Sequence, residues 1–243
     1  MTAHRTPASG YVGRGLTERI VEELGRSIVV GELQAGEALP REEDLIDRYR
    51  VSRTTLRSAL TVLAAKGLIE MRPKVGTRVL AASEWASFDP AVLRWSLDGA
   101  EGAALATAFL ELRLIVEPDA ARLAALRATP DDLDAMEGAV ADMHARLDED
   151  AYAHADVAFH VAVYRSTGNP VLAQFGDLVA GVMLRVFDDQ QVRARSAHED
   201  LAADARRHDA VVAAMRARDG AAAARAMRAV VLDGADAGDE HDD

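Results

Sequence analysis

Apolar positions in the first third of the chain recur at helical spacing in three separate stretches. Between residues 16 and 28 an apolar side chain stands at every fourth position, which predicts an amphipathic helix of about 16 residues. Pro40 opens a second, shorter helix whose acidic first turn suits the positive end of the helix dipole. Ser52 can cap a third helix of about 14 residues that ends at Gly67. Two short β-type segments, GLIEMR and TRVL, then flank a turn and predict a hairpin.

Helix, helix, short turn, helix and hairpin, in that order, predict a winged helix-turn-helix domain. From residue 89 onward the pattern is helical throughout, and caps and turns divide it into six or seven antiparallel helices of an all-α bundle. The expected fold is therefore mainly α. The boundaries that we expect are a disordered lead at 1–14, a winged helix-turn-helix domain at 15–82, a linker with a short helix at 83–100, a helical domain at 101–236 and an acidic tail at 237–243.

The longest predicted helix runs from about Glu101 to Arg127. It contains Pro118, which should kink it because proline removes a backbone donor and crowds the preceding turn. Five apolar side chains of this helix are expected to face the core: Leu105, Phe109, Leu112, Val116 and Leu123.

Composition limits the class of protein. Hydrophobic residues make up 49% of the chain, yet no apolar run approaches the roughly 18 residues of a membrane helix. Residues 1–15 lack the apolar segment of a signal peptide. The absence of cysteine excludes disulfides, thiolate chemistry and cysteine-based zinc sites. We therefore expect a cytoplasmic protein without a membrane partner.

Charge is unevenly distributed along the chain. The formal net charge of −12 would by itself argue against nucleic acid as a partner. Residues 1–82, however, carry 13 Lys and Arg against 10 Asp and Glu, whereas residues 83–243 carry 15 against 30. This asymmetry fits a mildly basic DNA-binding domain joined to a separate acidic body.

The third predicted helix carries the residues that point to DNA. Arg53 and Arg57 stand one turn apart on its exposed side, and arginine offers the fork that pairs with the acceptors of guanine. Thr54 and Thr55 are short enough to let the helix approach phosphate or a thymine methyl, and Ser52 caps the same end. In helix-turn-helix motifs this end of the helix reaches the base edges.

The hairpin supplies further candidates. Lys74 and Arg78, on either side of Gly76, would add contacts to phosphate or to the minor groove. The alternative is that Arg53 and Arg57 are solvated charges on a small helical domain. The ordered series of cap, apolar spacing, glycine stop and wing favours DNA binding.

The run GEALPREEDLIDRYRVSRTTLRSALTVLAAKGLIEMRPKVGTRVL resembles the DNA-binding domain of the GntR family of bacterial transcription regulators. The matching positions are Leu39-Pro40, Val51-Ser52-Arg53, Arg57, Ala59-Leu60, Leu63, Gly67-Leu68-Ile69 and Gly76-Thr77. The family commonly carries an arginine early in the second helix that touches the DNA backbone, whereas Glu43 stands there in this chain. Either that contact is lost or Arg41 supplies it. The resemblance implies a homodimer that reads a pseudo-palindromic operator in double-stranded DNA.

One segment of the helical part, ADVAFHVAVY, carries chemistry. Asp156 and His160 are spaced i, i+4 among apolar neighbours, so they share one face of a helix that is at least partly buried. A buried carboxylate needs a partner or a metal, and this pair is suited to a divalent transition metal. The alternative is a hydrogen bond from Asp156 to His160 or to another neighbour. His208 is a third candidate, but the sequence alone does not single it out among seven histidines.

Three segments of this part resemble the effector domain of the FadR subfamily of GntR regulators: ELRLIVEPDAARLAAL, AHADVAFHVAVYRSTGNPVL and EDLAADARRHDAVVAAMRARDGAAAARAM. In many members an aspartate and a histidine one turn apart, with two histidines from the last helices, hold a metal. Asp156, His160 and His208 fall on three of these positions, and Val230 stands near the fourth. The resemblance therefore implies a site for zinc, nickel or manganese with three possible outcomes. Water or an effector oxygen completes the metal coordination, the metal binds weakly, or the pocket works without metal.

Arg113 is the effector-binding candidate that the resemblance implies, because the subfamily often places an arginine there that faces the pocket. An arginine fork pairs with carboxylate, which indicates a carboxylic-acid effector. The alternative is a surface arginine paired with Glu117, its i+4 neighbour. The stretch SEWASFDPAVLRWSL resembles regulators of sugar-acid catabolism, particularly the galactonate type, and this favours a sugar acid.

The function that we expect is therefore ligand-responsive transcription regulation by a repressor that a small carboxylic or sugar acid releases, and not catalysis. The effector would contact Arg113, Glu117, Asp156, His160 and His208. Two alternatives remain open. One is a metal-dependent hydrolase or lyase with an accessory DNA-binding-like domain, and the other is a metal-free acyl-CoA sensor of the same fold.

Overall fold

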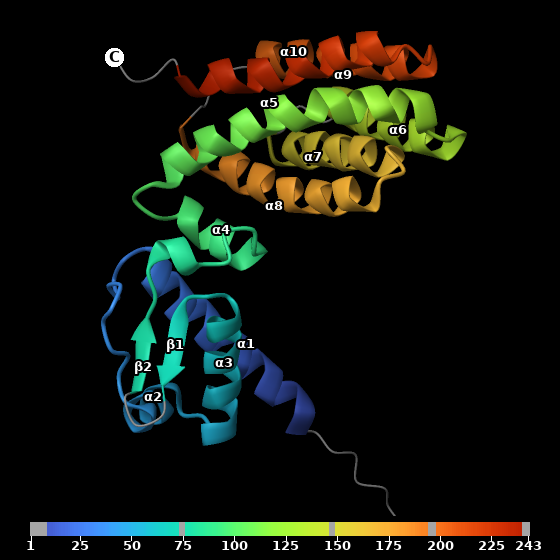
Figure 1. Cartoon of the computed structure of the whole chain (residues 1–243). Coiled ribbons are helices and arrows are strands. Elements are labelled where there is room, and N and C mark those ends of the chain that lie inside the picture. Colours follow the sequence, from blue (N-terminus) through green and yellow to red (C-terminus); the bar gives the residue numbers. More distant parts are fainter. Residues whose placement is uncertain (1–8, 73–75, 146–148, 194–197, 240–243) are drawn as a thin grey trace, which may run out of the picture. The chain divides into compact units, whose positions relative to one another are not determined.

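The computed structural model describes residues 9–72, 76–145, 149–193 and 198–239. The chain divides into two compact units, Met1–Gly102 and Ala103–Asp243, and each is described by itself. Figure 1 shows that, over these residues, regular structure in both units is helical apart from one small hairpin in the first. This confirms the expected mainly α fold. Among the described helices, none combines the length and the apolarity needed to cross a membrane.

The first unit is a winged helix-turn-helix domain followed by one further helix. Its hairpin is antiparallel, with Ile69 opposite Val79 and Arg72 opposite Gly76. In chain order its elements are α1 (Ser9–Val29), α2 (Glu42–Tyr49), α3 (Arg53–Ala65), β1 (Ile69–Arg72), β2 (Gly76–Val79), a 3₁₀ turn (Ala82–Glu84) and α4 (Pro90–Leu97). Helix α1 begins within the segment that we expected to be a disordered lead.

The core of the first unit follows the predicted apolar stripes. Side chains of α1 and α3 that are at most 3% exposed meet there: Ile20, Leu24, Ile28, Leu56, Leu60 and Leu63. Helix α4 belongs to the same core, because the Trp95 ring packs so closely on Gly25 that a β-carbon there would lie 2.4 Å from it. Trp95 Nε1 also donates to Glu22 Oε1 at 2.8 Å. The absence of a side chain at Gly25 therefore allows α4 to pack against α1.

Replacing Gly67 with alanine should destabilise the first unit. Gly67 ends α3 with φ of +73°, and a β-carbon there would lie 2.2 Å from the carbonyl oxygen of Glu84. We expect the free energy of unfolding to fall by roughly 2–4 kcal/mol, since strain and a backbone clash add. Urea unfolding can be followed by tryptophan fluorescence, because both tryptophans lie in this unit.

The matched control is Gly15→Ala, which lies in α1 with nothing within 4 Å of the added carbon. Alanine there should be neutral or stabilising by up to about 1 kcal/mol. Equal free energies of unfolding for the two variants would contradict the close approach of the Glu84 carbonyl oxygen to Gly67.

The second unit is a bundle of six described helices. They are α5 (Gly102–Arg127), α6 (Pro130–Ala145), α7 (Glu149–Ser166), α8 (Pro170–Arg193), α9 (His198–Arg216) and α10 (Gly220–Asp239). Helix α7 packs between α6 and α8, and α9 packs on α10 and α6 (Figure 1). The all-α bundle is therefore as predicted, although α10 extends into the segment that we expected to be the acidic tail.

Helix α5 buries a different face from the one we predicted. Of the five apolar side chains expected inside, only Phe109 is fully buried, and the other four are half-buried. The buried positions toward the end of the helix, and directly after it, are alanines instead: Ala120, Ala121, Ala124, Ala125 and Ala128. All but Ala120 belong to the apolar core of the bundle, and Leu110 and Leu114 are partly buried at its edge. The helix also runs through Pro118 as one α-helix.

Candidate DNA-reading helix and buried effector site

Helix α3 begins with a formed N-cap and presents a polar face to solvent. Ser52 Oγ accepts a hydrogen bond from the Thr55 backbone N–H at 3.1 Å and lies 2.9 Å from Thr55 Oγ1. The face beyond the cap lines a shallow hollow of about 520 Å³ formed by Arg53, Thr54, Arg57, Ser58 and Thr61. The predicted residues of α3 thus lie together at the end of the helix that enters the groove in such motifs.

The polar side chains of this face have different interaction partners. Ser58 Oγ and Thr61 Oγ1 donate to carbonyl oxygens one turn back in their own helix. Arg57 Nε lies 3.5 Å from Glu42 Oε2, but 64% of the Arg57 side chain is exposed. An exposed ion pair of this kind is weak, so phosphate or guanine can compete with Glu42 for Arg57.

The remaining predicted DNA-binding residues lie at different places in the first unit. Arg41 is exposed directly before α2, and Gly76 begins β2 with φ of +103°. Arg78 Nη1 donates to the carbonyl oxygen of Gly36 at 2.7 Å, so it ties the hairpin to the preceding loop. Lys74 lies outside the described residues.

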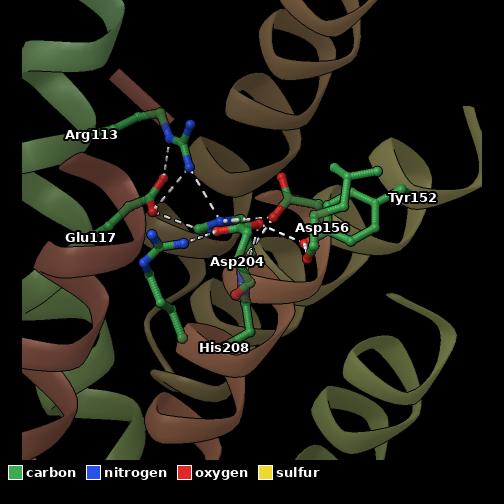
Figure 2. A network of polar contacts seen from close by, with 9 residues as sticks. Arg113, Glu117, Tyr152, Asp156, Asp204 and His208 are labelled. Carbon is green, nitrogen blue, oxygen red and sulfur yellow. Dashed lines mark hydrogen bonds and ion pairs between the residues drawn. The ribbon is translucent and has the colours of Figure 1, made fainter. Parts of the chain in front are cut away.

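A buried polar cluster occupies the second unit, and Figure 2 shows its side chains converging from α5, α7 and α9. Asp156 and His160 come from α7 and His208 from α9, and all three are at most 4% exposed. One ligand atom of each lies within 4.8 Å of the others. His208 Nε2 is 3.0 Å and His160 Nε2 is 3.6 Å from Asp156 Oδ1. The three predicted metal ligands are therefore brought together.

The outer nitrogens of the two rings have different neighbours. His160 Nδ1 lies 2.8 Å from Glu117 Oε2, and His208 Nδ1 lies 2.9 Å from the carbonyl oxygen of Asp204. Both rings consequently turn Nε2 toward Asp156. Among the described residues, neither His208 Nε2 nor His160 Nδ1 has an aligned hydrogen-bond partner, although both are buried. Two inward imidazole nitrogens and one carboxylate fit a divalent transition metal.

Arg113 lies beside this cluster and is paired with Glu117. Arg113 Nε donates to Glu117 Oε1 at 2.7 Å, and Arg113 Nη2 is 3.2 Å from His160 Nε2. The side chain of Arg113 is 15% exposed and that of Glu117 is 1% exposed. The pairing that we considered as an alternative is present, but it lies inside the bundle and not on its surface.

The buried charges shift one another's ionisation. Burial alone would raise the pKa of Glu117, but Arg113 and His160 outweigh it and lower the pKa to about 2. Burial would lower the pKa of His160, but Glu117 and Asp156 raise it to about 9. The pKa of Asp156 is likewise held far below its usual range, against the effect of burial, by the two histidines.

These charges pull the His160 ring toward two protonation states. The two carboxylates favour a doubly protonated ring, whereas arginine can only donate, so its contact at Nε2 requires that nitrogen without a proton. A divalent cation beside Nε2 would replace the second proton next to Asp156, while the proton on Nδ1 would stay next to Glu117. The arrangement can therefore exchange a proton for a metal ion.

Tyr152 and Asp204 belong to the network although they were not predicted. Tyr152 donates its hydroxyl to Asp204 Oδ2 at 2.6 Å, and Asp204 in turn supports His208 through its backbone. Each precedes a predicted ligand by four residues, which was the available sequence signal. Val230 is buried in the apolar core of the bundle, so it supplies no ligand.

The fold and the two sites define a class of protein, a DNA-reading domain joined to a helical domain with a buried polar site. Residues 16–79 match the bacterial regulatory proteins of the gntR family, and residues 108–233 match the FCD domain. The chain belongs to the GntR family of bacterial transcription regulators, with an FCD domain as its second unit.

Individual relatives agree with this assignment. The chain is similar to the galactonate operon transcriptional repressor of Escherichia coli strain K12, with 35% identity over 216 residues, 88% of this chain and 93% of the relative. It is 31% identical to the transcriptional repressor NanR of Citrobacter rodentium over 219 residues, 88% of this chain and 81% of the relative.

Solved structures support the fold. The Lar protein, which controls expression of the agr system in Listeria monocytogenes, matches with a TM-score of 0.58 over 95% of each chain. Its sequence identity is 16%, so this likeness shows the fold alone.

Proposed function

We propose that this regulator is a cytoplasmic homodimeric repressor that leaves a pseudo-palindromic operator when a small carboxylic acid binds its second unit. The observation that carries the proposal is Arg113, held inside the bundle within 3.2 Å of a histidine of the Asp156, His160 and His208 cluster. A guanidinium fork pairs with carboxylate. The galactonate operon repressor is a relative, so sugar acids are the first class to test.

The DNA half of the proposal rests on the exposed face of α3. Two protomers related by a two-fold axis would place Arg53, Thr54 and Arg57 once in each half-site. Arginine would read guanine, and threonine would contact phosphate or a thymine methyl. Arg41, Lys74 and Arg78 are proposed to contact the DNA backbone, which positions the domain without reading sequence.

In the second unit, Asp156, His160 and His208 are proposed to hold a zinc, nickel or manganese ion. Three protein ligands leave coordination positions open, which water or an oxygen of the effector can fill. A bound divalent cation would supply a strong positive charge and a second point of attachment for an acid. The protein's own residues orient that acid, with Arg113 on one side.

The charges of the site favour an anion once a divalent cation is bound. With both histidines neutral, Arg113, Glu117, Asp156 and the ion together carry one positive charge. A monocarboxylate neutralises this charge in a buried place, whereas an uncharged sugar does not. Effector and metal should therefore strengthen each other's binding, and the acid is held without turnover.

A thermal-shift screen of the purified protein against sugar acids and small carboxylic acids tests the effector proposal. At about 100 times its dissociation constant, the effector should stabilise the folded state by roughly 2.7 kcal/mol and raise Tm by several degrees. A chelator should abolish the shift. The matched control is the aldose that lacks the carboxylate, which should give no shift.

Other outcomes of this screen would contradict the proposal. A shift that survives the chelator and is largest for acyl-CoA would indicate a metal-free sensor of the same fold. Consumption of the acid over hours, followed by chromatography, would indicate a metal-dependent hydrolase or lyase.

A further inference from the structure

Glu117 lies behind a metal-ligand candidate and is not itself one of the three inward groups. Its Oε2 is 2.8 Å from His160 Nδ1, on the side of the ring opposite Nε2, which lies near Asp156. Its other oxygen accepts from Arg113 Nε at 2.7 Å, so the carboxylate is held in one orientation. Glu117 is 1% exposed, and water therefore does not compete for either contact.

A histidine that binds metal through Nε2 must carry its proton on Nδ1. The negative charge of a carboxylate 2.8 Å from Nδ1 favours the proton on that nitrogen and makes the ring a stronger donor, even though the contact is not an aligned hydrogen bond. Arg113 favours the same tautomer, since it can only donate to Nε2. His208 has a backbone carbonyl in the corresponding place, a support that no side-chain substitution removes.

We propose that Glu117 is a positioning residue that sets the metal affinity of the site through His160. This inference rests on the metal site of the proposed function. The competing explanation is structural, in which Glu117 only neutralises the buried Arg113. The two explanations differ once Arg113 is replaced by an uncharged residue. If Glu117 only neutralises Arg113, Glu117 then has no further effect on metal binding. If Glu117 positions His160, its effect on metal affinity remains.

The experiment compares Arg113→Met with the double variant Arg113→Met/Glu117→Gln in the full chain. Both lack the arginine, so a difference between them reports the Glu117 carboxylate. Affinity for Co²⁺ and Zn²⁺ is measured by competition with a chromophoric chelator, and the visible spectrum of bound Co²⁺ reports ligand geometry. Circular dichroism checks that each variant is folded. Comparing Glu117→Gln with wild type measures the effect of the same carboxylate on metal affinity when Arg113 is present.

We expect Arg113→Met to bind Co²⁺ at least as tightly as wild type, because a cation near His160 Nε2 has been removed. The double variant should bind roughly 10- to 100-fold more weakly than Arg113→Met, with a changed Co²⁺ spectrum. The matched control is Glu137→Gln, which removes a glutamate paired with Arg216 in the same unit but outside the site. It should leave metal affinity and spectrum unchanged.

Each failure has a distinct meaning. Equal affinity and equal spectra for Arg113→Met and the double variant would overturn the positioning role while leaving the metal site in place. Absence of Co²⁺ and Zn²⁺ binding by wild type would overturn the metal site and this inference together.

Discussion

Replacing Arg57 with alanine is expected to weaken operator binding by roughly 1–3 kcal/mol in each half-site, and by up to twice that for the dimer. Arg57 is 64% exposed on the face of α3 and forms an exposed 3.5 Å ion pair with Glu42, so its fork is available to guanine. The measurement is fluorescence anisotropy with an operator that the protein itself selects from random duplexes, repeated with each base pair changed in turn.

The pattern of loss distinguishes base reading from backbone contact. If Arg57 reads guanine, the variant should lose discrimination at one base pair of each half-site. A uniform loss with a shallower salt dependence would indicate a phosphate contact instead. Glu42→Gln is the matched control: it releases Arg57 from its ion pair and should bind the operator at least as tightly as wild type. Full affinity of Arg57→Ala would show that this face does not read DNA.

Replacing His208 with glutamine is expected to lower affinity for Zn²⁺ by more than about 100-fold. It removes one of only three proposed protein ligands, and binding energy in such sites is shared among few groups. His208 is fully buried and its Nε2 is 3.0 Å from Asp156 Oδ1, so it lies within the proposed ligand set. The shift in Tm caused by the acid effector should disappear with the metal, while operator affinity without effector is retained.

His144→Gln is the matched control for this prediction. His144 belongs to the same unit and contacts Asp209 at 2.8 Å, but its side chain is 42% exposed and lies outside the cluster. Metal binding and the effector response should survive this change. An unaltered Zn²⁺ affinity in His208→Gln would remove His208 from the site, and loss of operator binding in that variant would indicate a folding defect.

Together the two variants separate the halves of the proposal. Arg57→Ala should have lower operator affinity and an unchanged effector-induced shift in Tm. His208→Gln should keep its operator affinity and lose the effector-induced shift. Allosteric coupling between such sites typically amounts to about 1–3 kcal/mol and acts in both directions. The operator should accordingly lower effector affinity by the same factor by which effector lowers operator affinity.

Local signals in the sequence were enough to predict the helices and the hairpin of the winged helix-turn-helix part of the first unit. The cap at Ser52 and the positive φ of Gly67 are local features at the two ends of α3, and the apolar stripe of α1 lies along a single helix. The same reasoning placed Asp156 and His160 on one face of α7, because residues four apart on a helix point the same way. For these features the physics is short-range, and one sequence suffices.

Other features depend on contacts between distant segments. The sequence pattern could not show that Trp95 packs on Gly25, which assigns α4 to the first unit. It also favoured the leucines of α5 over the alanines, because periodicity shows that a face is apolar but not which apolar face the core covers.

The candidate site shows the same division. The i, i+4 spacing identified Asp156 and His160 as candidate ligands. The resemblance to the FadR subfamily of GntR regulators suggested His208 and Arg113. Only the tertiary structure brought Glu117 of α5 next to His160 of α7 and joined Tyr152 of α7 to Asp204 of α9. A buried polar network is selected by the partners that satisfy it in three dimensions, and those partners come from helices far apart in the chain.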